Sequence, residues 1–163
     1  ETPELRPEAS IQLQQLVSVY PANSRFQLRL MSLLISMDDY KGTLRTISNY
    51  LDKGKNLTES DLNLTKIWKV RAHLGLGETQ LAANTFKEIG TVFRHSSDDT
   101  PGWSIAWYVL TEGQLHDLTN RREQALAAYR ELLSIAKNTY VSDNILEAAR
   151  DGLSEPYQLR PSQ

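Results

Sequence analysis

The chain has no cysteine among its 163 residues, and this absence removes several kinds of chemistry at once. Without thiols there is no disulfide framework, no thiolate nucleophile and no thiolate metal ligand. The sequence also lacks a long apolar run, which excludes a membrane-spanning helix. No segment alternates apolar and polar residues in the way a half-buried strand requires. We therefore expect a soluble domain built from helices.

Motifs for catalysis and for cofactors are missing as well. The sequence holds no HExxH metal motif, glycine-rich phosphate loop, GxSxG elbow or dinucleotide fingerprint. Its three histidines, His73, His95 and His116, fall in different predicted elements. A net charge of -2 offers no bulk attraction for nucleic acid or for an anionic membrane. We expect a protein that is not an enzyme, with no cofactor, no metal site and no nucleic-acid partner.

What the chain does contain is a triplet of apolar or small residues that recurs four times, its members spaced by four and then three positions. The triplets are Ala9/Leu13/Leu16, Thr43/Ile47/Tyr50, Ala82/Phe86/Ile89 and Ala125/Tyr129/Leu132. Residues four and seven positions apart fall on one face of a helix. A stripe that recurs every few dozen residues is typical of stacked helical hairpins rather than of one globular core.

Capping residues, glycines and prolines divide the chain into predicted units within a single domain, 1–163. Thr58 with Asp61, and Asn120 with Glu123, have the pattern of capping boxes that begin the helices after them. The predicted units are a half repeat at 7–21, hairpins at 23–53, 59–93 and 101–138, and a closing helix at 142–152.

The two ends of the chain are polar and contain prolines, as in linkers that join neighbouring domains. The sequence also begins at Glu1 rather than at methionine. We expect a processed or excised piece of a larger protein. Its compartment stays open, with the periplasm and the cell exterior included, because cysteine-free domains occur on both sides of a membrane.

The segment from Gly113 to Tyr129 resembles a tetratricopeptide repeat (TPR). In that family the first helix carries a small residue where its partner crosses, which Gly113 matches here. The second helix carries a small residue near its start and an aromatic residue four positions on, which Ala125 and Tyr129 match. The resemblance extends to residues 77–86 and to the half repeat. The sequence departs from the family at Met31 and Val70, where the family has a small residue, and at Thr43, which replaces an alanine. It implies an all-α fold, a right-handed superhelix of about three antiparallel hairpins with flanking helices.

The function that the resemblance implies is protein or peptide recognition. First helices of successive hairpins line the concave side of such a stack and offer an extended surface. Basic groups there suit an acidic or C-terminal segment, since arginine pairs with carboxylates through two hydrogen bonds. An ordinary solvated helix face is the competing interpretation. The candidate residues on first helices are Arg25, Arg29, Lys66, Arg71, Gln114 and Asp117.

Trp103 and Trp107 form a second candidate, with Tyr108 beside them. The two tryptophans are four residues apart and so share one face of a predicted helix. They are expected either to form an anchor pocket for a ligand side chain or to pack in the core.

A structural role is the alternative function. TPR-like segments also occur fused to catalytic domains, including hydrolytic ones, where they support dimerisation or pack on their own enzyme. The first predicted helix has no preceding helix to cover its apolar face, so a homodimer formed through it stays open.

Overall fold

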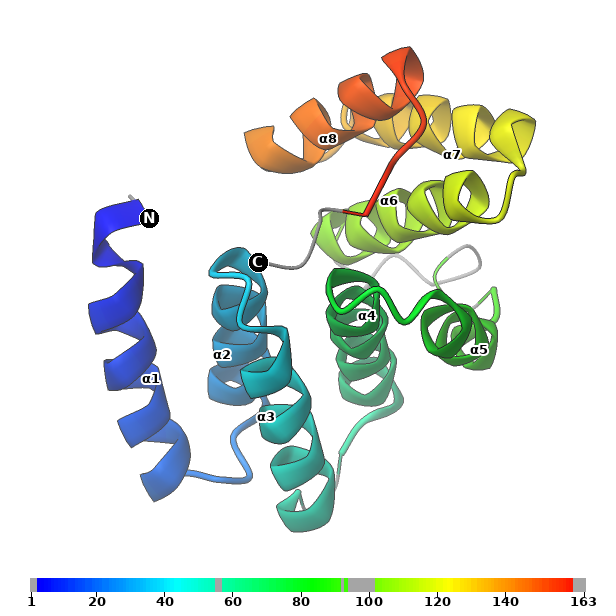
Figure 1. Cartoon of the computed structure of the whole chain (residues 1–163). Coiled ribbons are helices and arrows are strands. Elements are labelled where there is room, and N and C mark those ends of the chain that lie inside the picture. The colour runs from blue at the N-terminus through cyan, green and yellow to red at the C-terminus, as the bar shows by residue number, and fades with distance from the viewer. Residues whose placement is uncertain (1–2, 55–56, 92, 94–101, 160–163) are drawn as a thin grey trace. The chain divides into compact units, whose positions relative to one another are not determined.

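Helices make up all of the regular structure in the computed structural model, which describes residues 3–54, 57–91, 93 and 102–159 (Figure 1). No strand occurs in these ranges, which confirms the all-α prediction. The predicted loop from His95 onward lies outside the described residues up to residue 101. The elements are η1 (Pro3–Leu5), α1 (Arg6–Val19), α2 (Ser24–Ser36), α3 (Tyr40–Lys53), α4 (Glu59–Gly75), α5 (Thr79–Ile89), α6 (Gly102–Leu118), α7 (Arg122–Ile135) and α8 (Asp143–Ser154).

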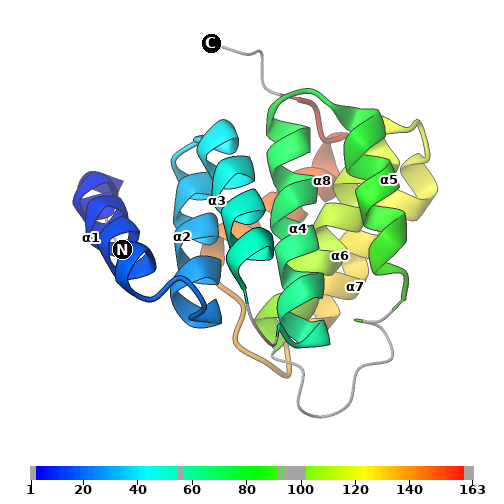
Figure 2. The same cartoon turned by 90° about the horizontal axis from the view of Figure 1, so that it is seen from below.

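The chain divides into two compact units, Glu1–Glu78 and Thr79–Gln163. In the first unit each helix packs on the next from α1 to α4, and α2 also packs on α4 (Figure 2). In the second unit each helix packs on the next from α5 to α8, and α6 also packs on α8. The boundary between the units falls inside the predicted hairpin 59–93. That the chain acts as one domain stays a prediction.

Four helices are followed by a described residue with positive φ: Gly90 comes directly after α5, with φ of 59°, and the other three lie two positions beyond the ends of α2, α4 and α6. These three residues are Asp38, Gly77 and Asn120, with φ of 58°, 77° and 55°. In each turn the N–H of the next residue donates to the carbonyl five positions back, over 2.8 to 3.0 Å. This bond satisfies a carbonyl that the helix end would otherwise leave unpaired. In all three cases the first member of a triplet follows five residues later.

The predicted capping box at Asn120 is wrong. Its place is taken by the left-handed turn that ends α6, and the residue that precedes α7 is Arg121, whose side chain makes no capping hydrogen bond. Asparagine tolerates positive φ better than most residues, because its short side chain bonds locally. The other predicted box is confirmed, since the N–H of Asp61 donates to Thr58 Oγ1 over 3.1 Å and the N–H of Thr58 donates to Asp61 Oδ2 over 3.3 Å.

The recurring triplets differ in how well they are covered. Members of the last three triplets are buried, apart from the half-buried Phe86. In the first triplet Ala9 and Leu13 are only half-buried, and Leu16 is 38% exposed. The predicted core stripe is therefore confirmed in α3, α5 and α7, while α1 leaves part of its stripe uncovered.

Tyr129 fixes the packing of α6, α7 and α8 through two glycines. A Cβ atom at Gly113 would lie 2.6 Å from Tyr129 Cε1, and one at Gly152 would lie 2.5 Å from Cε2. Both distances are far shorter than van der Waals contact, so only glycine lets the flanking helices approach the ring this closely. Gly113 is the small residue that the TPR resemblance implies at a helix crossing, and α7 does cross α6 there.

Replacing Gly113 by alanine is expected to destabilise the second unit by about 1–3 kcal/mol, because the added methyl group overpacks the ring of Tyr129. Urea unfolding followed by circular dichroism measures the change. Gly90→Asn is the control without overpacking: apart from its chain neighbours, no atom lies within 4 Å of a Cβ there, and asparagine is among the residues that best tolerate its φ of 59°, so only a smaller backbone strain is expected. An equal loss of stability in both variants would contradict the packing argument.

Candidate binding surface

Arg25 and Arg29 lie on the exposed side of α2. The helix begins at the N-cap Asn23, whose side chain accepts from the N–H of Phe26 over 3.2 Å. On its other side, six residues between Gln27 and Ile35 are buried. Arg25 and Arg29 are one turn apart on the opposite side and are exposed to solvent. α2 contains no aspartate or glutamate. The structure therefore places both predicted arginines on one exposed basic strip.

A polar clamp ties the start of α2 to α3 and α4. Ser24 Oγ donates to Asp61 Oδ2 over 2.9 Å, and the hydroxyl of Tyr50 donates to Ser24 Oγ over 2.7 Å. Tyr50 is fully buried, and burial is the main reason that its pKa lies above the usual value. Asp61 also belongs to the capping box that begins α4. One carboxylate thus sets the positions of the two helices that carry the predicted basic residues.

Lys66 and Arg71 on α4 are not brought to one face. Five positions in a helix correspond to a rotation of about 140° between side chains. Arg71 lies one turn from Gly75, where a Cβ would meet the ring of Tyr40 from α3, so it is on the side of α4 that packs against α3. Lys69, three positions after Lys66, is also half-exposed and shares its side of the helix. The sequence analysis missed Lys69, which the three-residue spacing could have identified.

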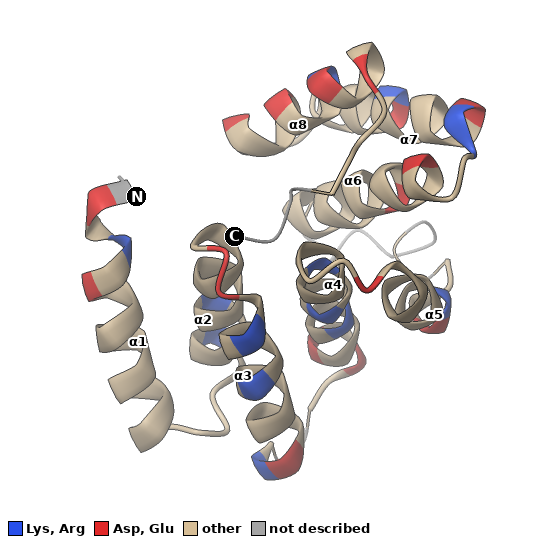
Figure 3. Ribbon diagram, in the orientation of Figure 1, with Lys and Arg blue, Asp and Glu red and all other residues tan. Residues whose placement is uncertain are grey.

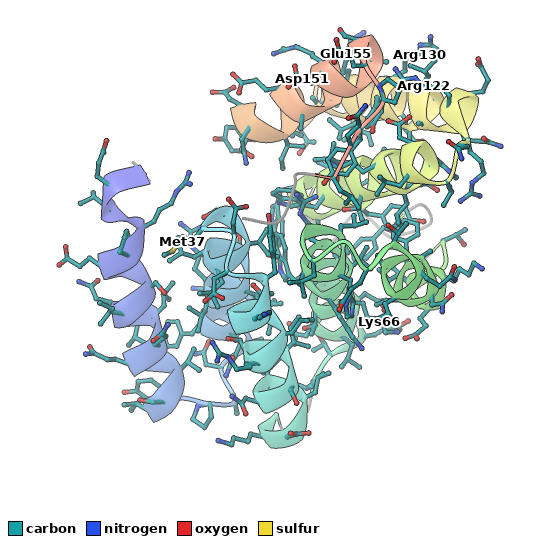
Figure 4. The ribbon with its side chains drawn as sticks, in the orientation of Figure 1. Met37, Lys66, Arg122, Arg130, Asp151 and Glu155 are labelled. Carbon is teal, nitrogen blue, oxygen red and sulfur yellow. The ribbon has the colours of Figure 1, made fainter. Side chains whose placement is uncertain are left out.

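Basic residues predominate over the whole α2–α4 segment of the first unit. Its three helices hold eight Lys or Arg against three Asp or Glu. Figure 3 shows these residues in blue on all three helices. The turn between α2 and α3 adds two more acidic residues, Asp38 and Asp39, so the excess of positive charge belongs to the helices themselves. Lys66 is labelled on α4 in Figure 4.

Asp117 has no surface to offer a partner, because its carboxylate is fully buried in the second unit. Arg122 Nη1 donates to both of its oxygens over 2.9 and 3.1 Å, and the hydroxyl of Tyr129 donates to Oδ2 over 2.8 Å. The N–H of Tyr157 also donates to Oδ2 over 2.8 Å. This arrangement corrects the prediction that Asp117 contacts a partner: it is the centre of an internal hydrogen-bond network.

The network joins α6, α7 and the chain after α8. Arg122 Nη2 also donates to the carbonyl of Leu153 over 3.3 Å, and Figure 4 shows Arg122 beside this part of the chain. Burial and the Asp117 carboxylate raise the pKa of Tyr129 far above its usual value. Gln114, another predicted contact, is also buried on α6, at 6% exposure. The second unit therefore contributes neither of its two predicted polar contacts to an exposed surface.

The tryptophan pair is divided between surface and interior. Trp103 is 41% exposed, Trp107 is half-buried, and Tyr108 is buried against Phe86, with ring centroids 4.9 Å apart. The core interpretation holds for Tyr108 and fails for Trp103. Gly102, next to Trp103, packs on Thr139, so the exposed tryptophan lies near the connection between α7 and α8.

Metal sites and membrane spans were also sought in the described ranges. No group of three or more His, Asp or Glu side chains there is arranged to hold a metal ion. No helix among those residues is both long enough and apolar enough to cross a bilayer. His73 is instead paired through Nδ1 with Glu78 Oε2, at 2.6 Å, beside the turn that ends α4.

Comparison of the chain with models of protein families, with curated proteins and with solved structures finds no match in any of the three. The interpretation of the surface therefore depends on the geometry described above and on the sequence resemblance.

The second unit is expected to lose stability as the pH rises above about 10, the usual pKa of an unfolded tyrosine. Folding raises the pKa of Tyr129, so its hydroxyl binds the proton more tightly in the folded state than in the unfolded state. The stabilisation that this gives below pH 10 therefore declines above it. Tyr129→Phe should reduce the slope of unfolding free energy against pH by up to about 1.4 kcal/mol per pH unit. Urea unfolding between pH 9 and 11.5 measures this slope.

Tyr140→Phe serves as the control, because Tyr140 is 84% exposed and its side chain is solvated in both states. It should keep the slope of the unchanged protein. A Tyr129→Phe slope equal to that of the control would show that the buried network does not couple to this hydroxyl.

Proposed function

We propose that the chain is a non-catalytic interaction module, a TPR-like stack of helical hairpins that binds an acidic protein or peptide segment. The packing within each unit supports such a stack: consecutive helices pack together, and α2 packs on α4 as α6 packs on α8. The left-handed residues at 38, 77 and 120 support a repeat, because each precedes a triplet by the same five positions. A right-handed superhelix is the arrangement that this periodicity favours.

The observation that carries the proposal is the exposed basic strip on α2. Arg25 and Arg29 project from a helix without acidic residues, and the helix that packs beside it carries Lys66 and Lys69. Positive charge is not spread evenly over the chain, since Glu1–Glu78 holds ten Lys or Arg and nine Asp or Glu, whereas Thr79–Gln163 holds eight and eleven. The first unit is therefore the one suited to an acidic ligand.

The expected affinity is modest and depends on salt. Exposed ion pairs contribute about 0–1 kcal/mol each, and arginine adds geometric selectivity through paired hydrogen bonds to a carboxylate. Screening at physiological ionic strength acts over about 8 Å, so direct contacts survive while longer-range attraction is lost. The clamp at Ser24 and Asp61 holds α2 and α4 in place before binding, which lowers the ordering cost.

A structural or dimerising appendage is the second candidate function. The specific observation in its favour is the exposed apolar side of α1, where Leu16 is 38% and Val19 is 66% exposed. This surface and the basic strip lie on different helices of the first unit, so the two functions are separable by mutation.

The double variant Arg25→Glu, Arg29→Glu tests the proposed function. A fluorescein-labelled decapeptide of alternating Glu and Leu is titrated with the full chain, and fluorescence anisotropy gives the dissociation constant. The peptide should bind, its affinity should fall as salt rises, and the double variant should bind at least about tenfold more weakly, equivalent to 1.4 kcal/mol. A decapeptide of alternating Lys and Leu should not bind.

The control is Arg45→Glu, Lys41→Glu. Both residues are exposed on α3, the second helix of the α2–α3 hairpin, and the pair makes the same change in charge. This control should retain most of the affinity. If both double variants lose affinity equally, the peptide responds only to net charge, and recognition through α2 is refuted.

A further inference from the structure

Exposed apolar side chains are concentrated on α1. Among the described residues, nine large apolar side chains are exposed, and five of them lie between the end of η1 and the residue after α1. These five are Leu5, Ile11, Leu16, Val19 and Tyr20, with exposures of 57, 58, 38, 66 and 55%. By contrast, α1 is held to α2 by its other side, where Arg6 Nη1 donates to the carbonyl of Ser36 over 2.9 Å.

Part of this set forms a regular seam. Leu5, Ala9, Gln12, Leu16 and Val19 are spaced by four, three, four and three positions. This alternation keeps residues along one side of a helix and is the spacing with which two helices pack lengthwise. Hereafter these five residues are called the α1 seam. Ile11 is exposed but projects about 100° away from Gln12, the middle of the seam.

The α1 seam is nearly symmetric about its centre. Leu5 and Val19 are each seven positions from Gln12, and Ala9 and Leu16 are three and four positions from it. We propose that α1 pairs with α1 of a second copy, antiparallel and about a two-fold axis beside Gln12. The pairing sets Leu5 near Val19 of the other copy and small Ala9 near large Leu16. An isologous contact requires this kind of self-complementary surface.

The charge and the hydrogen-bonding groups of the α1 seam also favour a second copy of the chain as its partner. The segment from Ala9 to Tyr20 holds no charged residue, so antiparallel pairing brings no like charges together at the seam. The side chain of Gln12 is exposed and carries both donors and an acceptor. At a two-fold axis the amide of one Gln12 can donate to the other and accept from it. A single polar pair of this kind fixes the register of two packed helices.

The other hairpins show how the chain covers an equivalent stripe. In α3 and α7 the triplet is buried, and each of these helices follows a partner to which it is joined by a tight turn. One side of a 14-residue helix is about 21 Å long and about 10 Å across, which is smaller than the roughly 800 Å² that each partner buries in a standard interface. The dimer is therefore weak and concentration-dependent.

Val19→Arg tests the pairing. Sedimentation equilibrium of the full chain over a wide concentration range should show a monomer–dimer equilibrium. The substitution should raise the dissociation constant at least tenfold, because it sets an arginine against Leu5 in both halves of the interface. Val19 is 66% exposed, so the variant creates no cavity in the folded chain. Ile11→Arg is the matched control, with the same charge on the same helix, and it should leave the dimer intact.

The double variant Leu5→Glu, Val19→Arg tests the antiparallel register. Opposite charges then meet in both halves of the interface, so the dissociation constant should fall back at least threefold from that of Val19→Arg. A monomer at every concentration, an equal effect of Ile11→Arg, or no recovery in the double variant would each overturn the proposal. None of these outcomes bears on peptide binding by Arg25 and Arg29, which are left unchanged.

Discussion

The left-handed residue that ends α2, α4 and α6 is the constraint on which the rest of the structure depends. It lets the chain turn back without leaving buried carbonyls unpaired, since the following N–H reaches the carbonyl five positions earlier. The turn then sets the register of the next helix, so that a buried small residue falls five positions later each time. Different side chains meet the same requirement: aspartate at 38, glycine at 77 and asparagine at 120.

A second consequence is that each helix must be covered by its neighbours in sequence. α3 and α7 are flanked on both sides within their own units, and their stripes are buried. Within the described residues, α2 is the α-helix on which α1 packs extensively, and the outer side of α1 keeps exposed leucine, valine and tyrosine. The same rule that buries the core of the other helices therefore marks α1 as the place where a further helix fits.

Much of the fold was predictable, because helical periodicity and capping are local properties. The triplets and the Thr58–Asp61 box could be identified from spacing alone, and the small residue Gly113 from the resemblance to a tetratricopeptide repeat. Asn120 was misinterpreted because asparagine is favourable both as an N-cap and in a left-handed turn. Only the hydrogen bond from the next residue distinguishes these two roles.

The candidate surface was less predictable, because it depends on contacts between helices. Asp117 has the charge of a surface residue, yet Arg122, Tyr129 and the N–H of Tyr157 enclose it. The arginine is five positions away, across the turn, and the tyrosine amide is forty positions away, beyond the reach of any helical pattern. Arg71 was grouped with Lys66 although five positions separate their sides of α4. Arg25 and Arg29, one turn apart, needed no such distant information.

The measurement that tests the account most directly is an NMR titration of the full ¹⁵N-labelled chain with the acidic Glu–Leu decapeptide. The account predicts that amide signals from α2 and α4, centred on Arg25, Arg29 and Lys66, shift progressively and saturate with peptide. Signals from the α6–α8 network around Asp117 should stay unchanged. Shifts confined to Thr79–Gln163, or no saturable shift at all, would contradict recognition by the first helices of this stack.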